Sequence, residues 1–78
     1  MKFVYILESE CGEHFYVGVT DDVAVRLRSH NAGSVPHTAK FKPWKVRTYV
    51  AFSGQTRAFA FERYLKSGSG RAFCANRF

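Results

Sequence analysis

Three groups of side chains in this sequence could do chemistry: two tyrosines, an arginine with a histidine, and a lone glutamate. Tyr5 and Tyr16 lie in two β-prone runs joined by a short polar connection. If Glu8 pairs with Glu13 across that hairpin, Tyr5 falls opposite Tyr16, and directly opposed residues share one face of a sheet. This register predicts two neighbouring phenols, whereas the alternative interpretation is a pair of ordinary strand tyrosines.

Arg26 and His30 are four residues apart in a helical pattern, so they lie one above the other along one side of that helix. The apolar stripe of Val23 and Leu27 borders this side and is expected to face the sheet. A guanidinium held there can bind a phosphate through two parallel hydrogen bonds. The alternative is an arginine that is solvated at the surface.

Glu62 is the only carboxylate in residues 23–78, a segment that carries eleven bases. It follows Phe61 and precedes Leu65 by three positions, so it lies at the border of the buried stripe of a second helix. A carboxylate there costs free energy unless it is paired or binds a metal. Because Mg²⁺ commonly takes only one or two carboxylates, Glu62 alone is adequate to hold Mg²⁺ or Mn²⁺. A salt bridge to Arg63 or to an arginine of another element is the alternative.

The net charge of +6 is distributed unevenly along the chain. Residues 1–22 hold one base and five acids, whereas residues 23–78 hold eleven bases and one acid. A basic body suits a polyanion such as DNA or RNA, bound through phosphate contacts that release counterions. A solvated basic surface is the alternative. The side chains expected to bind nucleic acid are Lys40, Lys42, Lys45, Lys66 and Arg71.

The length allows one domain over residues 1–78, and 46% apolar with 17% aromatic residues is enough for a core. Cys11 and Cys74 form neither a C-x-x-C pair nor a zinc spacing with the histidines, so we expect free thiols in a reducing compartment. No apolar run approaches about 18 residues and no signal peptide opens the sequence. We therefore expect a cytoplasmic protein that does not bind membranes.

The hydrophobic pattern predicts three strands, over residues 3–7, 15–20 and 47–52. A first helix is expected to begin after an N-cap in residues 20–22 and to run to about Asn31, with Gly33 as its stop. Residues 34–46 indicate a basic loop. Two further helices are expected over residues 55–66 and 71–77. The order β-β-α-β-α-α predicts an α+β fold, a three-stranded β-sheet flanked by helices in a sandwich.

Taken in order, these residues resemble the GIY-YIG nuclease family. Phe3-Val4-Tyr5 lies where that family has Gly-Ile-Tyr, and Tyr16-Val17-Gly18 is a clear version of Tyr-Ile-Gly. Arg26 follows ten residues after Tyr16, in the helix where the family places its catalytic arginine. Glu62 lies in the later helix that bears the family's metal-binding glutamate.

The C-terminal part of the sequence extends the resemblance over the whole chain. Asn76 falls where the family has a supporting asparagine. The run Lys66 to Arg71 matches Lys-Ser-Gly-x-Gly-Arg, which is typical of the small stand-alone branch. The first motif departs from the family because Phe3 and Val4 replace glycine and isoleucine, at positions that pack rather than react.

The resemblance implies a metal-dependent endonuclease that hydrolyses nucleic-acid phosphodiesters. DNA is the expected substrate, and DNA repair or recombination is the expected setting. A water would attack the phosphorus in line, with a divalent ion held on Glu62 and with Arg26 stabilising the developing charge. Tyr5 would accept the water's proton, directly or by relay, which requires nearby cations to favour its phenolate because a free phenol has a pKa near 10. Tyr16 would orient the water or share its proton, and His30 would assist either tyrosine or a phosphate. The expected products carry 5′-phosphate and 3′-hydroxyl ends.

Two other functions are open on the sequence. A non-catalytic nucleic-acid-binding module would use Lys40, Lys42 and Lys45 for phosphates and Phe41 and Trp44 for base stacking. A structural or protein-interaction role is the third. The excision-repair incision subunit and the homing endonucleases of the family take their targeting from other domains. This chain would accordingly need a targeting partner or a structured substrate, or would have little specificity.

Overall fold

The computed structural model describes residues 1–77, with side chains described for residues 1–73. Its strands and helices follow the order expected from the sequence, with one short helix added between the first helix and the third strand. The elements are β1 (Lys2–Ser9), β2 (Phe15–Thr20), α1 (Val23–Asn31), α2 (Pro36–Ala39), β3 (Trp44–Phe52), α3 (Gln55–Leu65) and α4 (Gly68–Arg77). The predicted α+β class is confirmed.

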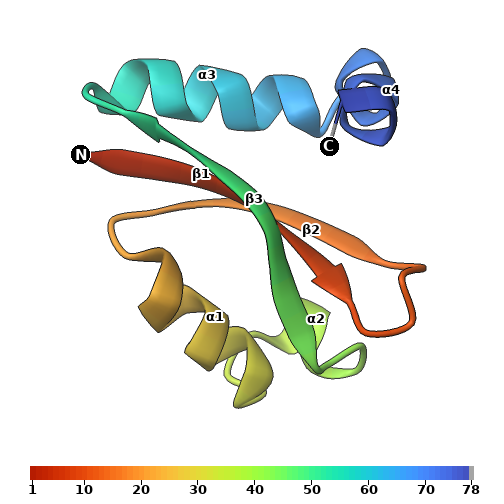
Figure 1. Cartoon of the computed structure of the whole chain (residues 1–78). Helices are drawn as coiled ribbons and strands as arrows, with labels where there is room; N and C mark the ends of the chain where they lie inside the picture. The colour runs from red at the N-terminus through yellow and green to blue at the C-terminus, as the bar shows by residue number, and fades with distance from the viewer. Residues whose placement is uncertain (78) are drawn as a thin grey trace.

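The sheet is antiparallel throughout and has the order β2-β1-β3, so β1 is central and β2 has a free edge in the described part of the chain. Figure 1 shows the sheet as a middle layer, with α3 and α4 on one side and α1 and α2 on the other. Val4 and Ile6 of β1 pack against the α3 side, while Tyr5 and Leu7 pack against the α1 side. All four are at most 3% exposed, so β1 is covered on both faces.

The register between β1 and β2 differs from the predicted one by two residues. Tyr5 is paired with Gly18, and Leu7 is paired with Tyr16. A slip of one residue would have moved the tyrosines to opposite faces, whereas a shift of two keeps them on the same face. The two phenols are therefore diagonal neighbours, with ring centroids 6.2 Å apart, and not a directly opposed pair.

The first helix has the predicted ends. The Asp22 carboxylate accepts a hydrogen bond from the Val25 backbone N–H at 3.1 Å, as an N-cap does. Gly33 follows the helix with φ at +81°, a conformation that glycine adopts without a steric cost. These two local signals place Arg26 and His30 within the helix, one turn apart.

The predicted basic loop is shorter than expected. Part of it forms α2, and β3 begins at Trp44 rather than at Arg47. The reason is the burial of Trp44, which is 4% exposed and whose indole N–H donates to the Thr38 carbonyl at 2.8 Å. The Asn31 side chain also bonds both the N–H and the C=O of Trp44. Trp44 is thus a core residue, and the prediction that it stacks on bases is wrong.

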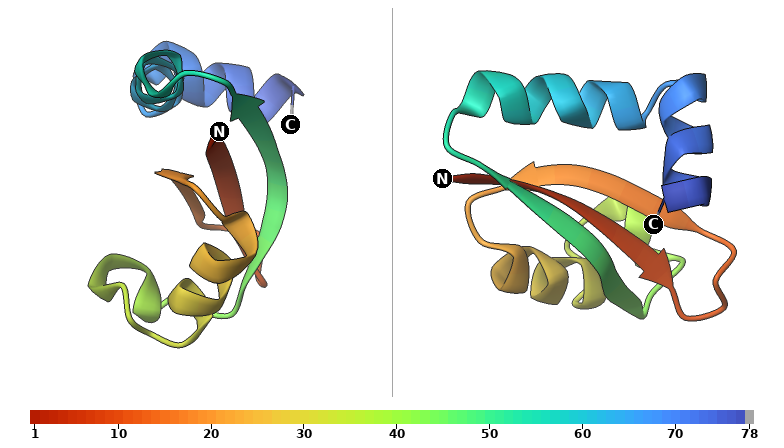
Figure 2. Two further views of the ribbon diagram at one scale, coloured as in Figure 1. Left: turned by 90° about the vertical axis from the view of Figure 1, so that its left-hand side faces the viewer. Right: turned by 45° about the horizontal axis from the view of Figure 1, so that its top comes forward.

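The last helix begins three residues earlier than predicted because Ser67 caps it. Its hydroxyl accepts from the Gly70 N–H at 3.1 Å. Figure 2 shows α4 turning across the end of α3. At this junction a Cβ on Gly70 would lie 1.8 Å from the Tyr64 carbonyl oxygen, whereas one on Gly68 would meet nothing within 4 Å.

This difference gives a prediction on stability. Gly70→Ala should lower the free energy of unfolding by about 2 kcal/mol or more, because the clash is with backbone that cannot rotate away. Gly68→Ala, in the same helix, should be neutral or slightly stabilising, since alanine favours a helix over glycine. Urea unfolding of both variants measures the effect, and equal stabilities would show that α4 does not pack on α3 this closely.

Candidate active site

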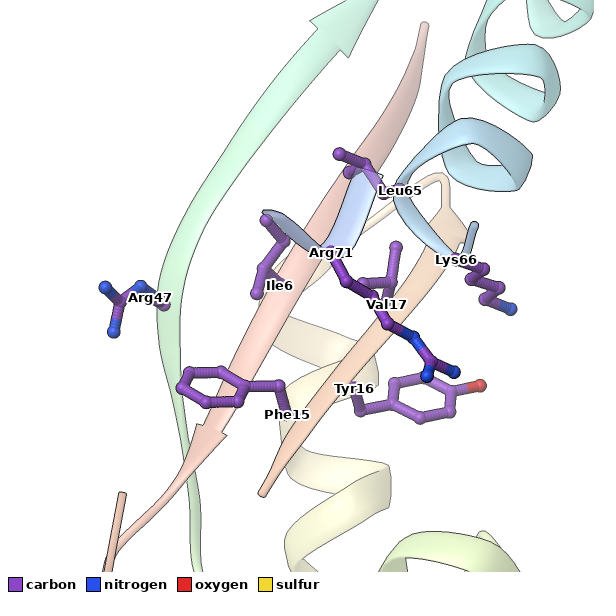
Figure 3. A pocket seen from close by; sticks show the side chains of 8 residues that line it. All are labelled: Ile6, Phe15, Tyr16, Val17, Arg47, Leu65, Lys66 and Arg71. Carbon is purple, nitrogen blue, oxygen red and sulfur yellow. The ribbon is translucent and has the colours of Figure 1, made fainter. Parts of the chain in front are cut away.

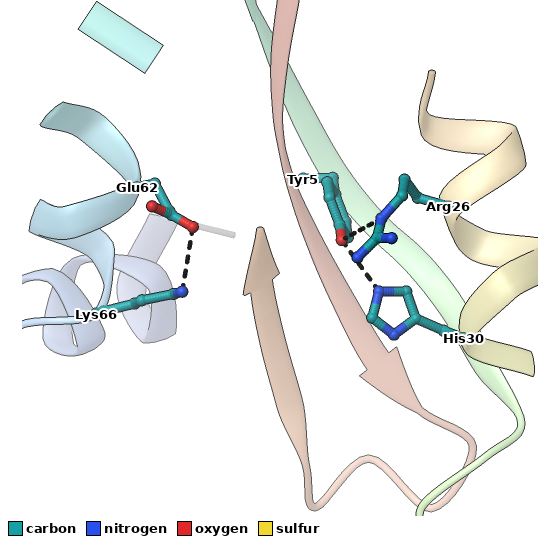
Figure 4. A network of polar contacts seen from close by, with 5 residues as sticks. All are labelled: Tyr5, Arg26, His30, Glu62 and Lys66. Atoms are coloured by element: carbon teal, nitrogen blue, oxygen red, sulfur yellow. Dashed lines mark hydrogen bonds and ion pairs between the residues drawn. The ribbon is translucent and has the colours of Figure 1, made fainter. Parts of the chain in front are cut away.

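Tyr5 is the central residue of the candidate site. Its side chain crosses Gly18 of β2, so closely that a Cβ at Gly18 would lie 2.6 Å from the Tyr5 hydroxyl oxygen. The hydroxyl lies 3.0 Å from Nε2 of His30 and accepts a hydrogen bond from Nε of Arg26 at 3.4 Å. Both partners come from α1, as Figure 4 shows. The glycine of the second sequence motif is thus needed because the tyrosine of the first motif occupies its side-chain space.

The hydrogen bonds around His30 form a chain with one consistent direction. The Thr38 hydroxyl donates to the Val35 carbonyl at 3.3 Å, so it accepts from His30 Nδ1–H at 2.7 Å. A neutral imidazole with its proton on Nδ1 has a lone pair on Nε2, which accepts the Tyr5 hydroxyl proton. The Tyr5 oxygen in turn accepts from Arg26. We assign this tautomer because the reverse one leaves the buried Tyr5 hydroxyl proton without an acceptor among the described residues.

Burial and the nearby arginine set the charge states of this chain. Burial raises the pKa of Tyr5, and the hydrogen bond and charge of Arg26 oppose this only in part, while the charges of Tyr16 and Glu62 add to the rise. Burial also lowers the pKa of His30, with a further contribution from the Arg26 charge. The hydrogen bond with Tyr5 raises the pKa of Arg26, so its guanidinium stays charged. A phenolate at Tyr5 would require its neighbouring cations to outweigh burial. Burial instead outweighs the Arg26 charge and raises the pKa of Tyr5, so the phenol is protonated at neutral pH.

Tyr16 completes the side of the site that faces α1. Its ring centroid lies 4.7 Å from that of His30 and 6.2 Å from that of Tyr5. Its side chain is half-buried, unlike that of Tyr5, which is 1% exposed. Tyr16 also contributes to the raised pKa of Arg26. Of the two phenols, Tyr16 is the one that solvent reaches.

Glu62 approaches from α3, on the other side of β2 (Figure 4). Its carboxylate is 22% exposed and forms an ion pair with Nζ of Lys66 at 3.1 Å, one helical turn further on. The charge of Glu62 is close enough to raise the pKa of Tyr5. The Lys66 Nζ also lies 5.8 Å from the centroid of the Tyr16 ring. The edge of β2 thus brings together groups from α1 and α3 that lie more than thirty residues apart in the sequence.

The ion pair of Glu62 differs from both predicted alternatives, because its partner is neither Arg63 nor an arginine of another element. Lys66, predicted to bind nucleic acid, is this partner and is half exposed. The side chain of Asn76 lies outside the described residues, although its backbone belongs to α4.

The remaining predicted basic contacts divide between two places. Arg71 lines a groove beside Tyr16 together with Lys66. Lys40 and Lys42 border a separate hollow next to the β1–β2 hairpin, where Phe41 stacks on His14 with centroids 3.8 Å apart. The fifth of these side chains, Lys45, is exposed on β3.

The hairpin also gathers three possible metal ligands that sequence spacing did not indicate. Ligand atoms of Cys11, Glu13 and His14 lie within 4.8 Å of one another. Lys40 and Lys42 line the adjacent hollow, and their positive charges oppose the binding of a cation there. Glu62 therefore remains the candidate ligand for a hard metal ion.

Glu62 fits such an ion in chemistry and position. Its oxygens are the hard ligands that Mg²⁺ and Mn²⁺ prefer, and Mg²⁺ needs only one or two protein carboxylates when water and substrate phosphate supply the rest. The one partner described for the carboxylate is the end of a long, exposed lysine side chain, which can move away.

Sequence reasoning missed two residues that hold the site together. Thr38 fixes the tautomer of His30, and Asn31 ties the end of α1 to Trp44. A signal for Thr38 was present, since a buried histidine needs partners for both ring nitrogens and a hydroxyl in the following loop can supply one. Nothing in the spacing singles out Asn31.

A comparison with known proteins shows which family the chain belongs to. Residues 1–75 match the GIY-YIG catalytic domain. The chain belongs to the GIY-YIG family. Members of this family are typically nucleases and generally use divalent metals.

Similar proteins include small relatives that this GIY-YIG domain matches over most of their length. A UPF0213 protein of Cupriavidus pinatubonensis is 36% identical over 77 residues, which cover 94% of this chain and 84% of the relative. The solution NMR structure of a UPF0213 protein from Bacillus halodurans has a TM-score of 0.57 at 29% identity, covering 96% of this chain and 83% of that one. A structure-specific endonuclease subunit, slx1, of Schizosaccharomyces japonicus is 34% identical over 64 residues, 77% of this chain but 23% of the relative. Within the described part of this GIY-YIG domain, no helix has the length and apolar character needed to cross a membrane.

The His30 environment predicts how stability depends on pH. Because burial lowers the folded-state pKa below the ordinary value of 6.5, the unfolded chain binds a proton first as the pH falls. The contribution of the neutral His30 side chain to the free energy of unfolding is complete above about pH 6.5. It is lost as the pH falls from there through the folded-state pKa of His30. Melting temperatures from pH 8 to pH 5, recorded for wild type and His30→Gln, measure this loss. The slope of melting temperature against pH should flatten in His30→Gln and persist in His37→Gln, whose side chain is exposed. Equal slopes in all three proteins would contradict the assignment of a buried, neutral His30.

Proposed function

We propose that this chain is a divalent-metal-dependent endonuclease that hydrolyses the phosphodiesters of nucleic acids, with DNA as its substrate. The products carry 5′-phosphate and 3′-hydroxyl ends. The observation that carries the proposal is the directed chain from Arg26 through Tyr5 to a neutral His30, with the Glu62 carboxylate across β2. A cation, a proton route and a single metal-ligand carboxylate are what phosphodiester hydrolysis requires. The family supports the reaction class.

Charge stabilisation falls to Arg26 and Glu62. The Arg26 guanidinium is charged, donates to Tyr5 through Nε and also interacts with Tyr16. A guanidinium placed in this way can turn its terminal nitrogens to a substrate phosphate. Glu62 would hold the divalent ion, and a bound ion of this kind stabilises negative charge developing on phosphate oxygens as a Lewis acid. Lys66 releases the carboxylate in exchange for a substrate phosphate.

Proton transfer falls to Tyr5 and His30. The attacking water gives a proton to the Tyr5 oxygen while the Tyr5 proton passes to Nε2 of His30, so that hydroxide, a neutral phenol and an imidazolium result. The new O–P bond forms as the bond from phosphorus to the 3′-oxygen breaks, and solvent protonates that oxygen. The His30 imidazolium returns its proton to solvent through Tyr5, which restores the starting state. This relay needs no phenolate, in keeping with the raised pKa of Tyr5 and the lowered pKa of His30. Tyr16, which is partly exposed, orients the water.

The biological setting is part of the same proposal. We place this activity in DNA repair or recombination, together with a protein partner that supplies targeting. Similarity to a structure-specific endonuclease subunit supports the partner. The exposed, free Cys11 thiol suits the reducing cytoplasm. A domain of this size, acting over residues 1–78, has little surface for sequence readout of its own.

A cleavage assay tests the proposal. The protein is incubated with labelled single-stranded, duplex and branched DNA and with RNA, in Mg²⁺ or Mn²⁺ and in EDTA. Cleavage should require the metal and should slow at least about a hundredfold in Glu62→Gln, because one carboxylate holds the ion. Arg63→Gln, a neighbouring exposed position of α3, is the matched control and should cut like wild type. Salt-dependent binding without cutting of any substrate would favour the non-catalytic binding module.

Thr38→Val tests the proton route. The variant keeps the shape of the side chain and the Thr38 carbonyl that accepts from Trp44, but removes the acceptor of His30 Nδ1–H. We expect kcat to fall about tenfold with little change in KM, because a fraction of the general-base contribution is lost with the tautomer. The pH profile of kcat should shift as well, and Thr38→Ser should restore both. A stability loss with unchanged kcat would leave Thr38 with a purely structural role.

A further inference from the structure

A groove of about 730 Å³ opens beside Tyr16 on the α3 side of the sheet (Figure 3). Its floor is apolar and consists of Ile6, Val17 and Leu65. The volume lies within the range of roughly 300 to 1,000 Å³ that small-molecule sites occupy. One nucleotide therefore fits, and none of the catalytic roles proposed above uses this space apart from its rim at Tyr16 and Lys66.

The rim of the groove is cationic. The residues that line the groove include three cations and no carboxylate. The cations are Arg47, Lys66 and Arg71. Arg47 pairs with Glu8 at 3.3 Å and Lys66 with Glu62, both at the periphery. For the Arg71 guanidinium no ion-pair partner occurs among the described residues, and its side chain lines the groove together with Tyr16 (Figure 3). Such a rim is complementary to a phosphate.

A β-bulge and an exposed aromatic complete the groove. The register between β1 and β3 shifts between Ile6 and Leu7, which pair with Thr48 and Val46, so Arg47 is the extra residue. A bulge re-aims the side chain that it carries. Arg47 accordingly reaches Phe15, with its guanidinium carbon 5.4 Å from the ring centroid.

Phe15 is 54% exposed although it is a large apolar residue. An aromatic ring on a cationic rim is what single-stranded nucleic acid binds, because every base can stack on it while arginines hold the backbone. Bases within a duplex are already stacked on both faces and do not reach such a ring. The groove thus distinguishes an unpaired base from a paired one.

We propose that this groove binds one unpaired nucleotide next to the phosphodiester that is cut, with the base on Phe15 and the apolar floor and the phosphate on Arg71 and Arg47. The inference rests on the proposed nuclease function, because it places the groove beside the scissile phosphate. The link is physical: Tyr16 and Lys66 line the groove and also contact the reacting groups, Lys66 through its ion pair with Glu62. The substrate class is single-stranded or locally unpaired nucleic acid.

Binding in EDTA tests this inference without cleavage. Fluorescein-labelled single-stranded and duplex oligonucleotides of one sequence are titrated with wild type, Phe15→Ala and Arg71→Gln by anisotropy. Phe15→Ala should weaken single-strand binding roughly tenfold or more and leave duplex binding unchanged, since it removes one stacking platform. Arg71→Gln should weaken single-strand binding more than duplex binding. Tyr49→Ala and Arg57→Gln, an exposed aromatic and an exposed base outside the groove, should bind like wild type.

The outcome that overturns the inference is an equal loss on single strand and duplex, or no loss at all, in Phe15→Ala. Melting temperatures of the variants ensure that a loss does not come from unfolding. Matched DNA and RNA single strands show which sugar the groove prefers, and a 2-aminopurine base should be quenched by wild type but not by Phe15→Ala.

If wild type cuts nothing yet the Phe15 effect is present, the nuclease function fails while the nucleotide site stands. If wild type cuts but Phe15→Ala binds normally, this inference alone fails.

Discussion

The contact between Tyr5 and Gly18 is the constraint on which the candidate site depends. The tyrosine can cross to the edge of the sheet only because its strand neighbour has no side chain, and it then carries a hydroxyl into a buried position. A buried hydroxyl needs partners, since an unsatisfied one costs about 1 to 3 kcal/mol. Arg26 and His30 supply them, so the packing of one tyrosine determines where α1 must lie and which of its side chains must face the sheet.

The hydrogen-bond chain extends this constraint into the segment after α1. His30 is fully buried, and its second nitrogen is satisfied by Thr38 of α2. The same short helix accepts the indole N–H of Trp44, whose backbone is held by Asn31. Among the described side chains, no buried nitrogen or oxygen lacks a partner. Because the buried polar groups of this chain all have partners, its hydrogen bonds are fixed in place, which is the preorganisation that general-base chemistry uses.

The second half of the site comes from the other face of the sheet. Because β2 is an edge strand, groups from α1 and α3 can meet around it without passing through the sheet. Glu62 and Lys66 reach this edge from α3, and Gly70 lets α4 pack against the end of that helix. The edge position also leaves room for the cationic groove beside Tyr16, so reacting groups and a place for a flanking nucleotide lie next to one another.

Local patterns in the sequence were sufficient for most of the fold. Alternation and apolar runs predicted the three strands, and capping residues gave both ends of α1, because these signals act between residues close in the chain. The start of β3 was wrong because burial against α2 decides it: Trp44 extends the strand by packing there. The start of α4 was wrong although its signal is local, because the Ser67 hydroxyl that caps Gly70 was not recognised as an N-cap. The β1–β2 register was off by two because the turn residues alone do not determine it, whereas the crossing of Tyr5 over Gly18 does.

The sequence by itself determined the residue types of the candidate site: two phenols, a helical Arg26–His30 pair and a lone carboxylate in a basic segment. Only the tertiary structure decided their charge states and mutual roles. Burial outweighs the Arg26 charge at Tyr5 and leaves a neutral phenol, which the spacing of the residues did not reveal. The groove with its bulged Arg47 was equally out of reach, since it joins residues from three strands and two helices. Desolvation and shape depend on everything packed around a residue, and neither is encoded in the spacing of that residue from its neighbours.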